Sequence, residues 1–369
     1  MRKFALLALG LAVAVLVGLG LVVLMSASEV KGLSDYRDSF YFVKRQCVYI
    51  GLGLAVAAGA AAFDYRKWRE HPSLAVFFCA AVFVALLAVF LFDPKKGSHR
   101  WIAIGPFGFQ PSEFAKIATV IAVAVWVDAV AWKIELFKKG ALVPALIIAA
   151  LAAPVLFEPD FGSVMVIGAV GFLLMFVGGT KILHMAPFVL ASVGVAVFKI
   201  LNNANRMARL ADFAHDDVYQ AKMSLVAIGR GGILGVGLMR SMQKQHYLPE
   251  AWTDFIFSVG AEEMGLIFSV GVMLVFLVFF LCSVYIARKA PDRFGKLLVV
   301  GMSFIIFFQA MFNIGVVCKA LPTKGMALPF FSYGGTNMLA AFFAVGTILS
   351  VGIRSLGAQD ERPFRRKAG

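Results

Sequence analysis

Two carboxylates stand just before a long apolar run in the stretch YLPEAWTDFIF, residues 247–257. They belong to Glu250 and Asp254. A carboxylate beside a membrane segment is costly unless it is paired or used. If partial burial raises the pKa of Asp254, the residue becomes a stronger base. The alternative is structural, with Thr253 as a helix N-cap and Asp254 in the first turn. The local sequence leaves both interpretations open.

A second polar group lies in GFQPSEFAKIA, residues 108–118, where Ser112 is positioned to cap a helix. Glu113 and Lys116 are three residues apart, so they share one helix face and can pair. A self-neutralising pair at a membrane entrance is the structural interpretation. The functional one is that Lys116 faces a polar cavity and contacts an anionic group.

Two further pairs of acids occur along the chain. Glu158 and Asp160 lie in FEPDFGS, which a Pro and a Gly predict to be a tight turn, where they could bind a metal or be solvated. The local sequence favours the solvated turn. Glu262 and Glu263 lie inside an apolar run, where carboxylates must face protein or a cavity, and structural support is the favoured role.

Arg206 and Arg209 occur in NRMARLADFAHDDVYQAKM, residues 205–223, which also contains Gln220. Arginines at a membrane interface suit diphosphate oxygens because the guanidinium group donates two parallel hydrogen bonds. Arginines that anchor a chain at the membrane surface would have the same sequence. Both interpretations stay open.

The stretch ALPTKGMALPFFSYGG, residues 320–335, has too many prolines and glycines for a continuous helix. Irregular backbone at membrane depth is tolerated only where protein or a cavity shelters it. We therefore expect an organised loop in which Lys324 and Ser332 line a cavity, with Gly334 and Gly335 as structural support.

The elements that must position these residues are transmembrane helices. The 369-residue chain is 61% hydrophobic and 15% charged, whereas soluble domains carry about 25% charged residues. Long apolar runs predict an all-α polytopic membrane protein with about ten transmembrane helices. We expect one domain over 1–369, a large extracytoplasmic loop over 202–252 between spans 7 and 8, and a basic cytoplasmic tail over 356–369. The expected spans are 4–25, 46–63, 73–92, 114–132, 141–157, 162–179, 184–201, 256–287, 296–318 and 338–355.

The net charge of +14 comes from residues in short loops. Loops rich in Lys and Arg stay on the cytoplasmic side, which places both termini inside the cell. This distribution argues against nucleic acid as a partner and for contact with membrane lipid. The long loop, Trp101 and the 320–335 stretch then share the extracytoplasmic side, which is the expected working face.

Four of these stretches, in this order, resemble the SEDS family (shape, elongation, division and sporulation), which polymerises peptidoglycan glycan strands. They are WIAIGPFGFQPSEFAKIA, EPDFGS, YLPEAWTDFIFSVGAEEMG and LPTKGMALPFFSYGG. NIGVVCKALPTKGMALPFFSYGG is more similar to the FtsW branch, which acts in division, than to the RodA branch, which acts in elongation. Trp252, Thr336 and Asn337 depart from the family pattern.

The resemblance implies a glycosyltransferase of the bacterial cytoplasmic membrane that acts on lipid II, an undecaprenyl-diphosphate-linked disaccharide-pentapeptide. It places the essential aspartate on Asp254 and a substrate-binding tryptophan on Trp101. Asp254 would be the general base that activates the acceptor sugar 4-hydroxyl. Basic residues, or a divalent metal such as Mg or Mn, would neutralise the diphosphate leaving group. The resemblance also implies a class B penicillin-binding protein as transpeptidase partner.

Two other classes of protein fit ten spans. A lipid II flippase would need polar groups from the inner to the outer face, whereas the motifs here gather on the outer side. A non-catalytic scaffold would need only smooth apolar spans, which leaves Asp254 and Glu262 unexplained.

Overall fold

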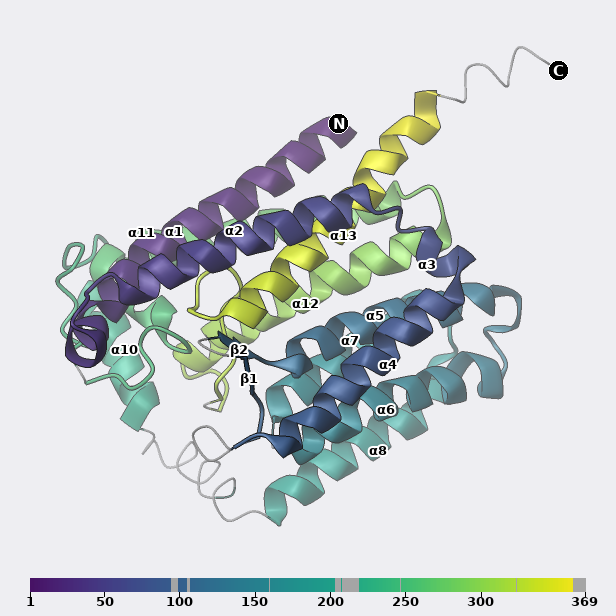
Figure 1. Ribbon diagram of the computed structural model, residues 1–369, viewed down its shortest axis with the longest axis horizontal. Coiled ribbons are helices and arrows are strands. Elements are labelled where there is room, and N and C mark those ends of the chain that lie inside the picture. Colours follow the sequence, from purple (N-terminus) through teal and green to yellow (C-terminus); the bar gives the residue numbers. More distant parts are fainter. Residues whose placement is uncertain are drawn as a thin grey trace.

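The computed structural model describes residues 1–93, 99–104, 107–158, 160–202, 207, 219–245, 247–322 and 324–360. Within this part of the chain, ten long helices run in alternating directions and form one bundle (Figure 1). They are α1 (Arg2–Tyr36), α2 (Tyr41–Ala62), α4 (Pro72–Ala88), α5 (Pro111–Ala129), α6 (Val143–Phe157), α7 (Phe161–Val177), α8 (Ile182–Leu201), α11 (Ile256–Arg288), α12 (Arg293–Val317) and α13 (Gly335–Asp360).

These ten helices match the ten predicted spans one to one, and the all-α polytopic fold is confirmed. Eight helices of the described chain are long and apolar enough to cross a membrane. The other two are α7, which is apolar but has only 17 residues, and α5. The polar residues Glu113, Lys116 and Asp128 make α5 less apolar than its neighbours.

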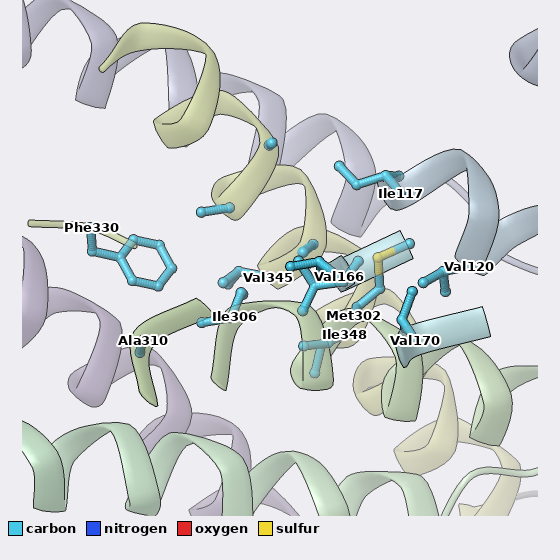
Figure 2. Close-up of a cluster of buried hydrophobic side chains, with 14 of the residues drawn as sticks. Ile117, Val120, Val166, Val170, Met302, Ile306, Ala310, Phe330, Val345 and Ile348 are labelled. Atoms are coloured by element: carbon cyan, nitrogen blue, oxygen red, sulfur yellow. The ribbon is translucent and has the colours of Figure 1, made fainter. Parts of the chain in front are cut away.

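The bundle has two groups of helices that meet along α5, α7, α12 and α13. In one group α2 packs on α13, and α1 and α12 pack on α11, while in the other α5 contacts α4, α6 and α7. Figure 2 shows the apolar core at the junction, with Val120 of α5, Val166 of α7, Met302 of α12 and Ile348 of α13 among its buried side chains. The packing of this apolar core fixes the helices whose polar ends form the site described below.

The start of α1 and the end of α13 lie at one end of the bundle, and α10 (Tyr219–Gly231) and the β hairpin lie toward the other (Figure 1). Strands β1 (Ile102–Ile104) and β2 (Phe107–Phe109) form that hairpin, with Ile102 opposite Phe109. The alternation of helix direction places the first residues of α2, α5, α7, α11 and α13 at the hairpin end. We call this the site end.

Helix α11 is interrupted near its start. Gly265 has φ 73° and ψ −165°, so residues 256–264 form a separate helical segment before the main span. The chain after α10 runs beside the break, where the amide of Leu266 donates to the carbonyl of Gly232 and the amide of Val236 donates to the carbonyl of Glu262. The predicted span over 256–287 is present, but it is not one continuous helix.

The predicted loop over 202–252 is partly helical, because it contains α10, which packs on α11 and α12. Residues 203–206 and 208–218 lie outside the described part. The first residues of the predicted tail over 356–369 belong to α13, which continues to Asp360, and residues 361–369 lie outside the described part. Helix α1 is also longer than predicted: its 35 residues span about 52 Å, against about 30 Å for a bilayer core.

The remaining elements are short. They are α3 (Lys67–Glu70), the 3-10 turns Val89–Leu91 and Ala131–Lys133, and a π-helical turn over Phe137–Leu142 that leads into α6.

Candidate functional site

Asp254 lies in a turn before α11, partly exposed at the site end. The helix begins at Ile256, so Asp254 is not in its first turn. The prediction that Thr253 is the N-cap was wrong: its hydroxyl bonds to Glu250 instead, at 3.3 Å to the carbonyl and 3.1 Å to Oε2. The capping explanation for Asp254 therefore does not hold.

The backbone around Asp254 is held by two buried side chains from other elements. Asn313 Nδ2 donates to the carbonyl of Asp254 at 2.8 Å and to the carbonyl of Met326 at 2.7 Å. Ser332 Oγ donates to the carbonyl of Thr253 at 2.6 Å. Ser332 is fully buried, so its hydroxyl fixes backbone and does not face a cavity as predicted. The segment over 324–333 is thus bonded to the turn that carries Asp254.

Residues 324 and 325 lie between Asp254 and the start of α7. Gly325 is in direct contact with the carboxylate, because a side-chain carbon at this position would lie 2.6 Å from Oδ2 of Asp254. The ammonium group of Lys324 lies 5.2 Å from the ring centre of Phe161, and its side chain covers Gly162. One short segment therefore places a cation at α7 and a glycine at the carboxylate.

The Asp160 carboxylate joins the starts of α5 and α7. It accepts bonds from the hydroxyl of Ser163 at 2.8 Å, the amide side chain of Gln110 at 3.4 Å and the hydroxyl of Ser112 at 3.5 Å. Asp160 is the N-cap of α7. The expectation that Ser112 caps α5 was wrong, because Gln110 occupies that position and Ser112 lies inside the helix.

Glu158 and Asp160 are both buried, so the predicted solvated turn was wrong. Burial and the charge of Asp160 raise the pKa of Glu158 to about 8, against the opposing effect of Arg100. Burial alone would raise the pKa of Asp160, but Arg100, Lys324 and the bonds from Ser163 lower it. At neutral pH the turn therefore carries mainly one negative charge, on Asp160.

The β hairpin is bonded to the start of α13. The amide of Gln110 donates to the hydroxyl of Thr336 at 3.1 Å, and that hydroxyl donates to the carbonyl of Gly108 at 3.2 Å. The ring of Trp101 lies against Gly108, where a side-chain carbon would be 3.2 Å from it. Trp101 is partly exposed at the site end. Its predicted contact with substrate stays a prediction.

Glu113 and Lys116 form the expected pair on α5, with 2.7 Å between Oε1 and Nζ. The Lys116 side chain is 1% exposed and that of Glu113 is 10% exposed. The pairing is confirmed, and the pair lies one turn inside the helix that begins at the Asp160 cluster. A contact of Lys116 with an anionic group of the substrate stays a prediction.

Glu262 and Glu263 bind the chain that follows α10. Glu262 accepts a bond from the hydroxyl of Ser241 and pairs with Arg230 at 3.2 Å. Glu263 accepts from the hydroxyl of Ser26 in α1 at 2.5 Å and from the amide of Ser241 at 3.1 Å. Both carboxylates thus bond to other parts of the chain, as a role in structural support requires.

The two predicted support glycines lie where α13 meets α2. A side-chain carbon at Gly335 would lie 2.6 Å from the ring of Tyr49, so only glycine allows this approach. The amide of Gly334 donates to Gln46 Oε1 at 3.4 Å, and Gln46 Nε2 donates to the carbonyl of Ser332 at 3.2 Å. Gln46 braces the loop from α2.

Three predicted substrate-binding residues remain, of which the structure describes one. Gln220 lies in the first turn of α10 and is partly buried. Arg206 and Arg209 lie outside the described residues.

The sequence interpretation missed Asn313, Thr336, Gln110 and Arg100 as members of the site. Asn313 carried a signal, because a buried amide inside the apolar run of α12 needs partners. Gln110 lies inside the 108–118 stretch, and Arg100 and Thr336 stand next to recognised motifs. Only the packing of α5, α7 and α13 shows what these three residues bond.

The sequence leaves open a divalent metal at the site. Among the described residues, no group of three or more His, Cys, Asp or Glu side chains is placed to hold one. Mg²⁺ commonly uses one or two carboxylates and completes its shell with substrate phosphates. The donors here thus fit at most a metal that arrives with a diphosphate, held by Asp254 and the substrate.

The helices α5, α7, α11 and α13 all begin at this end of the bundle, which also carries the partly exposed carboxylate of Asp254. Helix N-termini carry partial positive charge and favour anions. Lys324 and Arg100 add full positive charges at the α7 end of the cluster. The arrangement can hold a phosphate-bearing ligand with a carboxylate base beside it.

Fold and site together define a polytopic membrane protein with a polar site at one end of its helix bundle. The chain matches the model of the FtsW/RodA/SpoVE family of cell cycle proteins over residues 7–355. It therefore belongs to that family, as the sequence motifs predicted.

Named relatives share most of their length with this chain. The probable peptidoglycan glycosyltransferase FtsW of Geobacter metallireducens is 37% identical over 344 residues, which cover 92% of each chain. Stage V sporulation protein E of Bacillus subtilis is 35% identical, covering 91% of this chain and 93% of its own. The enzyme class of the FtsW relative is the class predicted from the sequence, peptidoglycan glycosyltransferase.

Solved structures have the same fold. One is a chain of a peptidoglycan synthase complex that coordinates polymerization and crosslinking, with a TM-score of 0.75, 24% identity and coverage of 94% and 97%. Another is the rod shape determining protein RodA of Thermus thermophilus, with a TM-score of 0.70, 25% identity and coverage of 94% and 95%.

Proposed function

We propose that this protein polymerises lipid II into glycan strands, as a division-type peptidoglycan glycosyltransferase in the bacterial cytoplasmic membrane. Family membership and the named FtsW relatives support the reaction. The observation that carries the proposal is the placement of Asp254, a partly exposed carboxylate whose backbone is fixed by Asn313 at the end of the bundle where α5, α7, α11 and α13 begin.

Asp254 acts as the general base. The 4-hydroxyl of the acceptor sugar gives its proton to the Asp254 carboxylate while its oxygen bonds to the anomeric carbon of the donor. The bond from that carbon to the diphosphate oxygen breaks, and undecaprenyl diphosphate leaves. A positioned base contributes about 10²–10⁴-fold to such a step.

Positive charge stabilises the leaving diphosphate. Lys324 supplies one such charge, since it directly precedes Gly325, the glycine that touches Asp254. Arg100 and the helix N-termini add to the same field. We assign Trp101, Glu113, Lys116, Glu158, Asp160, Arg206, Arg209 and Gln220 to binding or shaping the substrate sites, and Ser332 to fixing the backbone beside Asp254.

The orientation is inferred from charge. The basic loops at the end where α1 begins and α13 ends support a cytoplasmic location for that end, which makes the site end extracytoplasmic. Lipid II presented there would have its diphosphate at the membrane surface. A partner with crosslinking activity, a class B penicillin-binding protein, is proposed by likeness to the synthase complex.

A flippase is the weaker alternative. Polar groups would have to continue through the bundle, whereas the core between α5, α7, α12 and α13 is apolar (Figure 2). An elongation role, as in RodA, would use the same chemistry, and the FtsW and sporulation names of the relatives favour division or sporulation.

The test is polymerisation of labelled lipid II by purified protein in detergent micelles, with and without the transpeptidase partner. No transport is measurable in micelles, so polymer identifies an enzyme. Lack of polymer under both conditions, from monodisperse protein, would remove the proposal.

A further inference from the structure

A cluster of aromatic rings lies beside the Asp254 turn, where α1 ends and α2 begins. We name it the Trp252 aromatic cluster. Its members are Tyr36, Tyr41, Phe42, Tyr49, Trp252 and Tyr333. The polymerase chemistry proposed above uses none of these rings.

The rings are in continuous contact around Phe42. The centre of its ring is 6.1 Å from Trp252, 5.0 Å from Tyr333 and 5.8 Å from Tyr36. Tyr36 and Tyr41 are stacked, with ring centres 3.7 Å apart and planes 6° apart. Such a set of stacked and edge-on rings is stiff, so it presents a fixed surface.

This surface is attached to the Asp254 turn. Trp252 precedes Asp254 by two residues, and the amide of Tyr333 donates to the carbonyl of Trp252 at 3.1 Å. Trp252 and Tyr333 therefore lie in the two hydrogen-bonded segments, 252–254 and 324–333, that hold Asp254 in place. The distance along two residues is at most about 7 Å.

The outer rings remain accessible. Phe42 is 7% exposed and fills the centre, whereas Tyr36 is 49% exposed. Tyr41 and Trp252 are partly exposed. Cations lie among them, since Arg45 donates to the hydroxyl of Tyr41 at 2.8 Å. The result is a ring surface with a polar, charged edge.

A surface of this kind fits a sugar polymer. A pyranose ring has a face of C–H groups, whose hydrogens carry partial positive charge, and a rim of hydroxyls. The face of an aromatic ring is negative and attracts such hydrogens, while tyrosine hydroxyls and the Arg45 and Lys31 side chains can bond the rim. Lys31 Nζ itself lies 5.8 Å from the Trp252 ring centre.

We propose that the Trp252 aromatic cluster binds the sugars of the growing glycan strand next to the reacting pair and retains the strand between successive transfers. This inference rests on the proposed polymerase function. The rival explanation is an aromatic belt that anchors the protein at the membrane surface. A belt does not require that its rings be bonded to the Asp254 turn.

The test compares strand length with reaction rate. The double variant Tyr36→Leu/Tyr41→Leu keeps apolar side chains but removes the rings, and Tyr36→Phe/Tyr41→Phe keeps the rings. Trp132→Leu is the matched control, because Trp132 is 76% exposed at the opposite end of the bundle and also has a lysine over its ring, at 3.7 Å. Each protein is given labelled lipid II in detergent, and both the initial consumption of lipid II and the product length are measured.

We expect the Leu double variant to shorten the strands roughly threefold to tenfold, as loss of stacked contacts predicts, with a much smaller change in initial rate. The Phe double variant and Trp132→Leu should keep long strands. Strands of wild-type length from the Leu double variant would overturn the inference, and so would equal losses in the Leu and Phe variants.

Two further outcomes also have a defined interpretation. If the Leu double variant is not monodisperse, Trp252→Leu against Trp252→Phe replaces it and is read in the same way. If wild-type protein makes no polymer, the proposed function fails and this inference fails with it. Normal polymerisation with unchanged strand length overturns the inference alone.

Discussion

Oδ2 of Asp254 lies so close to Gly325 that a side-chain carbon at the glycine would be 2.6 Å from it. Contacts of side-chain carbons under about 3 Å do not occur without movement. The glycine is thus part of the wall that sets the orientation of the carboxylate. Through this contact the proline- and glycine-rich stretch over 320–335 affects the reaction, although Gly325 itself has no group that could take part in the chemistry.

Replacing this glycine should misplace the base. Gly325→Ala forces the Asp254 carboxylate to rotate away, and a displacement of about 1 Å costs about 10²-fold in rate. We expect polymerisation of lipid II to fall by about that factor while the protein remains monodisperse. The initial rate in detergent measures it.

Gly334→Ala is the matched control for this prediction. It lies in the same stretch, but a side-chain carbon there meets only Asn337, at 3.9 Å. It should keep more than half of the wild-type rate. Equal rates for Gly325→Ala and wild type would show that the carboxylate tolerates a different orientation.

Asn313 should matter for both stability and rate. Asn313→Ala removes two hydrogen bonds and leaves the carbonyls of Asp254 and Met326 without this donor. The expected loss of stability is about 1–3 kcal/mol, with a fall in kcat because the Asp254 turn loosens. Ser303→Ala on the same helix, where the hydroxyl bonds only the local carbonyl of Val300, is the control. Unchanged kcat in Asn313→Ala would contradict the positioning role.

The pKa of Glu158, raised to about 8, predicts how stability depends on pH. Below the ordinary pKa of 4.5 both the folded and unfolded states hold the proton. Between 4.5 and about 8 only the unfolded state releases it, so this group lowers stability as pH rises. Above about 8 both states are ionised and the loss stops.

Glu158→Gln removes that titration. Its advantage in stability over wild type should be small at pH 4.5 and should grow by up to about 1.4 kcal/mol per pH unit through this window. Thermal unfolding in detergent between pH 5 and 9 measures the gap. A gap that is constant with pH would mean that Glu158 is ionised in the folded protein.

The break in α11 should require glycine. Gly265→Ala places a side chain at φ 73° and makes it collide with the carbonyl of Ile233, so we expect a loss of at least about 3 kcal/mol. Gly271→Ala, in the same helix with open space around it, should change stability by less than about 1 kcal/mol. Similar melting temperatures for the two variants would argue against a fixed break.

The spans were predictable because a bilayer demands about 20 apolar residues for each helix, and hydropathy reports this directly. The break at Gly265 was not, since an isolated glycine in an apolar run looks the same whether the helix continues or not. It is decided by residues 232–237, which pair with the backbone there. Likewise, α10 is partly apolar, and its place against α11 depends on packing.

The site was predictable where charge had to be explained. Asp254, Glu113 and Lys116 stood out because charge near a membrane segment is costly, and the last two do pair. Local rules failed at Thr253 and Ser112, both expected as helix caps. Each hydroxyl has another partner, Glu250 and Asp160 respectively, and the partner of Ser112 is 48 residues away. Asn313 acts between segments that are distant along the chain, which no local pattern reports.

The central claim is that the Asp254 carboxylate takes a proton from the acceptor sugar. The most direct measurement is the rate of lipid II polymerisation in detergent by wild type and by Asp254→Asn, with both proteins monodisperse and equally stable. The asparagine keeps the shape but cannot accept the proton, so the rate should fall by about 10²-fold or more. Polymerisation by Asp254→Asn at the wild-type rate would contradict the claim.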